Sequence, residues 1–129
     1  SEGNVFISVK DEDKSQLKTL CSKLKGLGFS FIATKGTGLK MKEDGFAVKI
    51  INKVMEGRPH IVDAILNNEV SMVINTTEGR QSIKDSYSIR RSALEHSVFL
   101  TTTISGGFAI VESLEQGEKF WSYDALQNS

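Results

Sequence analysis

The sequence predicts an α/β domain in which five parallel strands lie between two layers of helices. Short runs of β-branched and aromatic residues alternate along the chain with segments of helical period, which is typical of repeated strand–helix–strand units. Most of these runs are almost continuously apolar, as expected of strands that are covered on both faces. The chain has 129 residues, the usual length of one domain. We therefore expect a single domain over residues 1–129, with its core at about 4–115 and a C-terminal tail at 116–129.

Five runs have the composition and length of strands. They are residues 5–9, 29–33, 47–51, 71–74 and 98–101. Each is followed by residues that favour turns or helix starts. We expect all five in one sheet, because strands joined by helices return to the sheet in parallel.

The segment between the first two predicted strands is an amphipathic helix. Its apolar residues recur at three- and four-residue spacing and form one stripe, with lysines outside it. The stripe consists of Leu17, Leu20, Cys21, Leu24 and Leu27. Asp11 or Asp13 is expected to cap the start of this helix, and Gly26 or Gly28 its end.

Four more helices are expected along the chain. A short one is predicted at 39–45. Pro59, the only proline, is expected in the first turn of the next, where its missing N–H costs nothing. A further helix is expected at 81–96, and the last at about 106–114. The helix at 81–96 is expected to turn three side chains inward, namely Ile83, Tyr87 and Leu94.

The balance of charge limits the partners of the chain. It has 16 lysine and arginine residues and 16 aspartate and glutamate residues, so its net charge is zero. This balance argues against nucleic acid or an anionic membrane as the main partner. Residues 1–58 nevertheless hold 11 basic and 7 acidic side chains, whereas residues 59–129 hold 5 and 9. The basic first half is compatible with a site for a small anion.

A single cysteine, Cys21, excludes an intramolecular disulfide and a multi-cysteine zinc site and is consistent with a reducing cytoplasm. Because Cys21 falls on the apolar stripe, we expect a buried thiol rather than a nucleophile. No run approaches the about 18 apolar residues that span a bilayer, and the first residues lack the layout of a signal peptide. The chain starts without methionine, close to the first predicted strand, so we expect a piece of a longer polypeptide.

Polar residues follow every predicted strand. In a parallel sheet the carboxyl ends of the strands meet at one edge, where ligands bind beside helix N-termini. In chain order, the residues at this edge are Lys10, Lys14, Thr34, Lys35, Gly36, Thr37, Gly38, Asn52, Lys53, Asn75, Thr76, Thr77, Thr101, Thr102 and Thr103. Ammonium groups, hydroxyls, amides and glycines together suit an anion of the phosphate type.

No specific phosphate loop is present. Gly36 and Gly38 are followed by Met41 where the dinucleotide fingerprint needs a third glycine, and there is no GxxxxGK[ST] loop. The segment 34–38 is equally compatible with an ordinary strand-to-helix turn. Its coincidence with lysines after the neighbouring strands favours anion binding.

The residues predict no catalytic or metal site. His60 and His96 lie far apart with no carboxylate at the helical spacing of metal ligands, and His60 is expected at a helix start or on the surface. The arginine pair at 90–91 favours surface or interdomain ion pairs over a phosphate clamp. Asp63 and Asp85 are expected to be solvated on helices. None of these residues is required as a general acid or base.

Four motifs occur in a set order. They are NKVMEGRPHIVDAI at 52–65, INTTEGR at 74–80, SIRRSAL at 88–94 and TTTISGGFA at 101–109. With them the sequence resembles the C-terminal regulatory domain of the large subunit of carbamoyl phosphate synthetase, a member of the methylglyoxal-synthase-like superfamily. The resemblance covers nearly the whole chain and implies a Rossmann-like, five-stranded parallel sheet between helices.

In that family the domain performs no chemistry and holds no cofactor; it binds uridine or inosine monophosphate, and ornithine. The resemblance implies an effector phosphate site at Lys14, Thr34, Gly36, Thr37, Lys53, Asn75, Thr76 and Thr77. Asp85 and Ile89 match residues that contact the base and ribose. Thr102 matches a residue that contacts ornithine, but Leu100 stands where the family has a tyrosine, which argues against ornithine sensing.

The resemblance also implies a larger cytoplasmic enzyme of pyrimidine and arginine biosynthesis. That parent is an ATP-dependent ligase, with Mg or Mn, which makes carbamoyl phosphate from glutamine, bicarbonate and ATP. The expected partners are the nucleotide effector, the catalytic part of the same large subunit, and the glutaminase small subunit. Nucleic acid and membranes are not expected partners.

Two alternatives remain open. Methylglyoxal synthase, a phosphate-eliminating lyase, binds dihydroxyacetone phosphate in a similar cradle and uses an aspartate of a GGDQ segment. Here the segment is EGRP at 56–59, and Arg58, at the aspartate's position, is no general base near neutral pH. The second alternative is a pure oligomerisation module, in which the partner is another copy of the chain.

Overall fold

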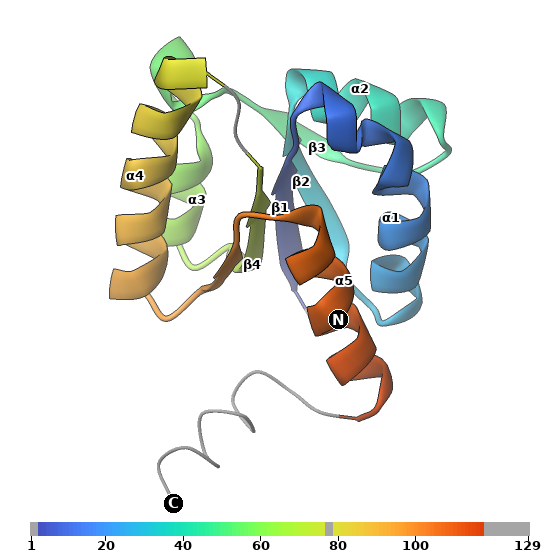
Figure 1. The fold of residues 1–129 in the computed structure, drawn as a ribbon. Helices are drawn as coiled ribbons and strands as arrows, with labels where there is room; N and C mark the ends of the chain where they lie inside the picture. The colour runs from blue at the N-terminus through green and yellow to red at the C-terminus, as the bar shows by residue number, and fades with distance from the viewer. Residues whose placement is uncertain (1–2, 77–78, 118–129) are drawn as a thin grey trace, which may run out of the picture.

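The computed structural model describes residues 3–76 and 79–117, and within it the side chains of 79–85 are not described. Five strands form one sheet in the order β3-β2-β1-β4-β5, and every pairing is parallel (Figure 1). The strands are β1 (Asn4–Ser8), β2 (Ser30–Thr34), β3 (Lys49–Ile51), β4 (Val70–Asn75) and β5 (Phe99–Thr101). The predicted fold class is confirmed, and each predicted strand overlaps an observed one.

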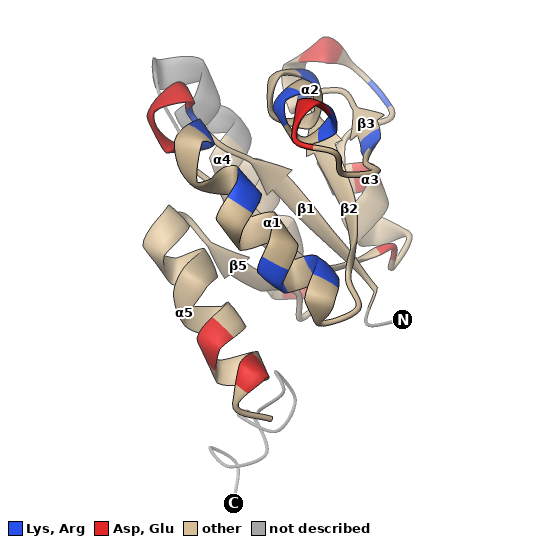
Figure 2. Ribbon diagram, turned by 90° about the vertical axis from the view of Figure 1, so that its right-hand side faces the viewer, with Lys and Arg blue, Asp and Glu red and all other residues tan. Residues whose placement is uncertain are grey.

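Helices cover both faces of this sheet. They are the 3-10 helix η1 (Asp11–Gln16), α1 (Leu17–Gly26), α2 (Lys35–Glu43), the 3-10 helix η2 (Val54–Glu56), α3 (Ile61–Leu66), α4 (Gly79–Glu95) and α5 (Ile104–Glu115). One face is covered by α1, α2 and α5, and the other by α3 and α4 (Figure 1). Figure 2 shows lysines along α1 and α2 and acidic residues towards the end of α5, in keeping with the opposite charge of the two halves of the chain.

The central strand β1 is buried on both faces. Val5 and Ile7 pack in the cluster beneath α1 and α5, whereas Phe6 packs in the cluster beneath α3 and α4. Each of these three residues is at most 1% exposed. This two-sided burial explains why the strand reads as an unbroken apolar run.

The predicted stripe of α1 is buried, but its start differs from the expectation. Asp11 and Asp13 lie inside η1, which runs directly into α1, so neither side chain caps the helix. At the other end Gly28 adopts a φ of +99°, and Phe29 N donates to Leu24 O across it. A glycine in this conformation ends a helix without steric cost, so the expectation for Gly28 is confirmed.

Pro59 precedes α3 instead of forming its first turn. The helix begins at Ile61 with His60 as its N-cap, which confirms the expectation of His60 at a helix start. The carbonyl of Pro59 accepts a hydrogen bond from Asn52 N at 3.1 Å, and Asn52 and His60 form an isolated parallel bridge. This pairing holds the proline segment extended against the edge of the sheet, so it cannot be helical.

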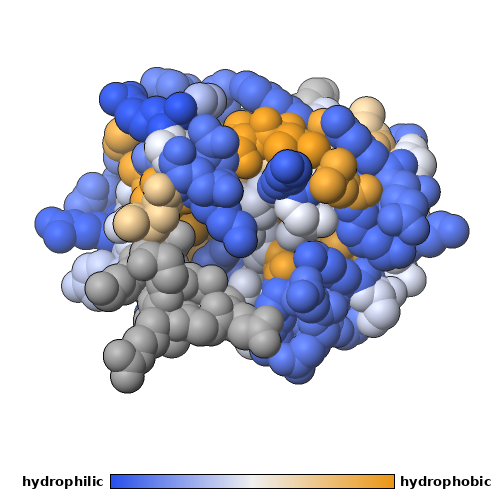
Figure 3. Space-filling model, turned by 90° about the horizontal axis from the view of Figure 1, so that it is seen from above, coloured by the Kyte–Doolittle hydropathy of each residue, from blue (hydrophilic) through white to orange (hydrophobic). Residues whose placement is uncertain are grey.

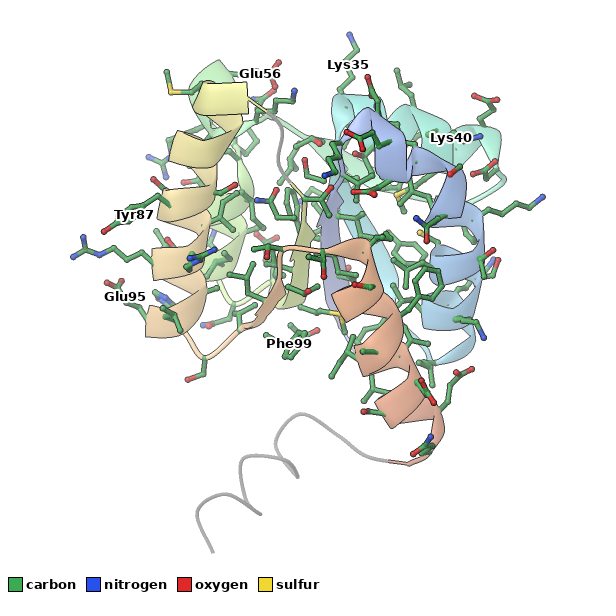
Figure 4. The ribbon with its side chains drawn as sticks, in the orientation of Figure 1. Lys35, Lys40, Glu56, Tyr87, Glu95 and Phe99 are labelled. Atoms are coloured by element: carbon green, nitrogen blue, oxygen red, sulfur yellow. The ribbon has the colours of Figure 1, made fainter. Side chains whose placement is uncertain are left out.

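The inward face of α4 also differs from the expectation. Tyr87 is 72% and Leu94 75% exposed, whereas Ile89 and Ala93, one helical turn apart, are buried against α3 and the sheet. Figure 4 shows Tyr87 pointing away from the sheet. The side chain of Ile83 lies outside the described residues. The prediction that Tyr87 and Leu94 point inward is therefore wrong.

Candidate functional site

A cavity of about 250 Å³ opens at the carboxyl edge of the sheet. It lies beside β1, where the chain order reverses: β2 and β3 lie on one side of β1, and β4 and β5 on the other. Helices lead away in opposite directions at such a switch point and leave a crevice there. Figure 3 looks onto this edge from above and shows apolar side chains surrounded by hydrophilic ones. Ligand pockets commonly hold about 300–1,000 Å³, so this cavity is small.

The lining of the cavity comes from three strand ends, from η1 and α2, from the segment after β3, and from α3 and α4. The lining residues are Phe6, Ser8, Val9, Lys10, Asp11, Lys14, Thr34, Gly36, Thr37, Lys53, Val54, Ile61, Asn75, Thr76 and Ile89.

Most of the predicted phosphate residues come together in this cavity. Seven of the eight line it, and the eighth, Thr77, lies outside the described residues. Ile89, expected near the base or ribose, also lines it, whereas the side chain of Asp85 is not described. Thr102 lies in the β5–α5 connection and is not part of the lining.

The three strand ends present polar side chains at one level. Ser8 is in register with Asn75, and the hydroxyls of Ser8 and Thr34 lie 2.9 Å apart. Thr34 is 4% and Asn75 6% exposed, so both are buried polar groups. The parallel register thus forms a polar floor from strands far apart in the sequence. Ser8 also lines the cavity, although the sequence does not predict it, because it lies within an apolar strand.

Two threonine hydroxyls hold the backbone that follows β1. Thr37 Oγ1 accepts a hydrogen bond from Val9 N at 3.0 Å, and Thr76 Oγ1 accepts one from Lys10 N at 2.9 Å. Thr76 N also donates to Ser8 O at 2.9 Å. These bonds hold the backbone that follows β1 in place, with α2 on one side and the end of β4 on the other. Both threonines therefore shape the rim of the cavity. The Thr37 hydroxyl in turn donates to Val9 O at 3.5 Å. The Thr76 hydroxyl, which accepts the bond from Lys10 N, can still donate its own hydrogen.

Asn75 is oriented from the opposite side of the cavity. Its Nδ2 donates a hydrogen bond to Ser86 Oγ of α4 at 2.8 Å. This bond determines which end of the amide group turns towards α4. The amide is therefore held in one orientation.

The helix α2 begins at Lys35, earlier than the predicted start at residue 39. The segment 34–38 is thus mostly the first turn of a helix rather than a separate turn. Thr34 is the N-cap, but its side chain makes no capping bond. The first turn of α2, all of which the structure describes, contains no acidic residue. The amides of this turn and the positive end of the helix dipole consequently lie at the cavity without a side-chain counter-charge from α2 itself.

Three lysines and one aspartate among the described residues give the cavity its charge. They are Lys10, Lys14, Lys53 and Asp11. Lys14 Nζ lies 2.6 Å from Asp11 Oδ1. The pKa of Asp11 is lowered, first by the hydrogen bond from Lys14, then by the charge of Lys14 and least by the charge of Lys53, while desolvation raises it. Lys35, also expected at this edge, is exposed at the start of α2, points away from the fold and does not line the cavity (Figure 4).

Asp63 is not solvated as expected. Its carboxylate accepts hydrogen bonds from Arg58 Nε at 2.8 Å and from His60 N at 3.0 Å, and its side chain is 13% exposed. The pKa of Asp63 is lowered by the backbone bond from His60 and by the charges of His60 and Arg58, while desolvation raises it. Arg58 is thereby held on α3 and does not line the cavity.

Other chemically active side chains of the described chain lie elsewhere. Cys21 is fully buried, and burial followed by the charge of Asp44 raises the pKa of its thiol to about 12, which confirms the expectation of a buried thiol. Arg91 forms a surface ion pair with Glu95 at 3.2 Å, as expected for this arginine. Within residues 3–76 and 79–117, no three His, Cys, Asp or Glu side chains are grouped to hold a metal ion. None of the helices described there is long and apolar enough to cross a membrane.

Fold and site together define a parallel α/β domain with a small, basic cavity at its switch point. A family model described as the MGS-like domain matches residues 16–102, well over half of the chain. The chain belongs to this MGS-like family. The family name agrees with the resemblance carried by the four motifs.

Relatives of high identity are carbamoyl phosphate synthase large chains. That of Pseudomonas putida (strain KT2440) is 56% identical over 115 residues, which are 89% of this chain and 11% of the relative. That of Pasteurella multocida (strain Pm70) is 50% identical over 114 residues, 88% of this chain and 11% of the relative. The chain therefore spans only about a tenth of the length of these relatives.

Two solved structures share the fold. A methylglyoxal synthase from Elizabethkingia anophelis NUHP1 has a TM-score of 0.67 and 18% identity, over 85% of this chain and 78% of the other. ForH has a TM-score of 0.65 and 18% identity, over 91% and 82%. At this identity the likeness concerns the fold alone.

Proposed function

We propose that this chain is the effector domain of a carbamoyl phosphate synthase large chain, and that its cavity binds the phosphate group of uridine or inosine monophosphate. The observation that carries the proposal is the pairing of lysines with the start of α2 in one cavity. Lys14 and Lys53 line it together with Gly36 and Thr37 of that helix. Lysine ammonium groups and the free amides of a helix N-terminus both bind phosphate in proteins.

The charge of the cavity suits this ligand. Three lysines and one aspartate line it among the residues that the structure describes, a net excess of positive charge. A phosphate monoester carries about −1.5 to −2 charges near pH 7, so the two charges are complementary. The hydroxyl of Thr76 and the amide of Asn75 add neutral hydrogen-bonding groups at the rim. Thr77, next in the chain, is proposed as a further contact.

The remaining part of the lining is apolar and suits the rest of a nucleotide. Phe6, Val54 and Ile89 come from three different elements and meet at the cavity. The volume of about 250 Å³ is close to the lower end, about 300 Å³, of the usual range for ligand pockets. We place the phosphate at the lysines and the ribose and base beside Ile89, with Asp85 as a further contact.

Regulation requires that the nucleotide bind one state of the larger protein better than another. A coupling of about 1–3 kcal/mol between effector and active sites is typical of allosteric proteins. The ligase chemistry, with ATP and Mg or Mn, and the glutaminase small subunit belong to the proposed cytoplasmic parent of pyrimidine and arginine biosynthesis. We leave ornithine out of the proposal, because Leu100 stands where the family has a tyrosine.

We propose no catalysis by the domain itself. Among the described lining residues only Asp11 carries a carboxylate, and its lowered pKa makes it a poor proton acceptor. Arg58 is bound to Asp63 and does not reach the cavity lining. A colorimetric assay with dihydroxyacetone phosphate should show no turnover, and any turnover would favour the lyase alternative.

Calorimetric titration of the 129-residue chain tests the proposal directly. Uridine and inosine monophosphates should bind saturably, whereas uridine and inosine, which lack the phosphate, should bind at least about tenfold more weakly. Absence of saturable binding by either monophosphate would overturn effector binding. A stable dimer that ignores nucleotides, detected by light scattering, would instead support the oligomerisation module.

A further inference from the structure

Asp11 occupies an unusual position for a carboxylate, because it lines a cavity whose other charged lining residues, as far as the structure describes them, are lysines. It opens η1, three residues before Lys14. In a 3-10 helix, residues three apart lie one above the other. This geometry brings Asp11 Oδ1 within 2.6 Å of Lys14 Nζ.

The two partners of this ion pair differ in their freedom to move. The side chain of Lys14 is 27% exposed, whereas that of Asp11 is 87% exposed. Lys14 is also close to α2, because its Nζ lies 3.3 Å from where a Cβ of Gly36 would stand. Asp11 can therefore swing into water without losing a buried contact, while Lys14 remains at the cavity.

The carboxylate lies in the field of a second lysine as well. The charge of Lys53 contributes to the lowered pKa of Asp11, after the larger hydrogen bond and charge of Lys14. The carboxylate of Glu56 has a different role, because its Oε1 accepts a hydrogen bond from the backbone N of Lys53, at 2.7 Å, and not from a lysine ammonium group. Asp11 thus partly neutralises the two lysines that are proposed to hold the phosphate.

We propose that Asp11 is a built-in competitor of the phosphate: its carboxylate holds Lys14 while the cavity is empty, and an incoming phosphate displaces it. The inference rests on the proposed phosphate site. On binding, the Lys14–carboxylate ion pair is exchanged for a Lys14–phosphate pair, and Asp11 turns outwards. The competitor weakens binding and limits the repulsion among the lysines of the empty cavity.

The test compares Asp11→Asn with Glu12→Gln by calorimetry, using inorganic phosphate and uridine monophosphate as probes. Both variants remove one negative charge from η1, but Glu12 does not line the cavity. Asp11→Asn should bind both probes about threefold to tenfold more tightly than the wild type, and Glu12→Gln should stay within about twofold. Asp11→Ala should behave like Asp11→Asn, which excludes an effect of the new amide.

Carbon-13 NMR of the Asp11 carboxyl group provides a second measurement. Saturating phosphate should raise the pKa of Asp11 in the wild type, because Lys14 leaves it and a negative charge approaches. Binding by Asp11→Asn no tighter than by Glu12→Gln, or an Asp11 pKa that phosphate leaves unchanged, would overturn the inference. If the wild type and all variants bind neither probe, the proposed phosphate site itself is wrong.

Discussion

The Nζ atom of Lys14 lies 3.3 Å from the point where a Cβ atom on Gly36 would stand. Lys14 belongs to η1 and Gly36 to the first turn of α2, so a missing side chain lets an ammonium group lie against a helix N-terminus. The positive charge of the Lys14 ammonium group and the positive end of the α2 dipole thereby lie close together. Their repulsion is unfavourable unless a negative charge lies beside them. Asp11 supplies that charge, with its Oδ1 2.6 Å from Lys14 Nζ.

We predict that Gly36→Ala weakens phosphate binding without destabilising the fold. The new methyl group would press on the Lys14 ammonium and shield the amides of the first turn from a ligand. We expect affinity for uridine monophosphate to fall about tenfold, the loss of roughly one hydrogen bond to a charged group. The free energy of unfolding should stay level or rise by up to about 1 kcal/mol, because alanine is the better helix former. Calorimetry and urea denaturation measure the two effects.

Gly26→Ala is the matched control. Gly26 is the last residue of α1, and a Cβ there would meet no heavy atom within 4 Å. This variant should gain similar stability and bind uridine monophosphate like the wild type. Equal affinity in the two alanine variants would contradict the proposed approach of phosphate to the start of α2.

Lys53→Ala should remove affinity while leaving stability almost unchanged. Lys53 is exposed, and its ammonium group makes no ion pair with any residue that the structure describes. Loss of a charge-assisted bond should weaken binding about tenfold or more, whereas the free energy of unfolding should change by less than about 0.5 kcal/mol. Lys18→Ala, on the exposed side of α1, removes the same charge away from the cavity. A variant at position 53 that fails to fold would reveal a structural lysine instead.

The strands and the floor of the site could be predicted because they follow from local composition. Apolar runs define β1 and β4, and the rule that ligands bind at strand carboxyl ends then brings Lys14, Asn75 and Thr76 together. The sequence predicts Asp11 as a helix cap and not as a lining residue, because η1, which brings it to the cavity, carries no apolar period. Ser8 is not predicted as a lining residue, because only its register with Asn75 shows that both residues lie at the same edge of the sheet.

The errors on helices have a different cause. The face that α4 turns inward is decided by its packing on α3, and Tyr87 and Leu94 share a helical stripe that remains exposed. The preference of proline for a first helical turn predicts Pro59 in a helix, but backbone pairing with Asn52 keeps it extended. In both cases a tertiary contact, absent from any local window of sequence, overrides the local preference.

The stabilisation provided by Asp63 should depend on pH. Its pKa lies below the usual value of 3.8, first because His60 N donates to its carboxylate and also because His60 and Arg58 are close. A lowered pKa in the folded state contributes stability above about pH 4 that is lost as the pH falls through the folded pKa. Asp63→Asn should therefore be less stable than the wild type near pH 7, and the difference should shrink towards about pH 2 in urea denaturation. A difference that is the same at both pH values would mean that the carboxylate charge plays no part.

The buried thiol of Cys21 should make the protein sensitive to alkali. Burial, and next the negative charge of Asp44, raise its pKa from 9.0 to about 12. Between these values the unfolded chain releases the thiol proton while the folded chain keeps it, so stability falls as the pH rises. In this window each pH unit lowers the free energy of unfolding by about 1.4 kcal/mol. At about pH 10.5 the total loss is therefore about 2 kcal/mol. Cys21→Ala should be less stable than the wild type at about pH 7.5, because packing is lost. The variant has no thiol to ionise, so the difference in stability should shrink by about 2 kcal/mol at about pH 10.5. Urea denaturation of both proteins under reducing conditions measures the two differences, and a deficit that stays constant would show that the folded thiol ionises as easily as the unfolded one.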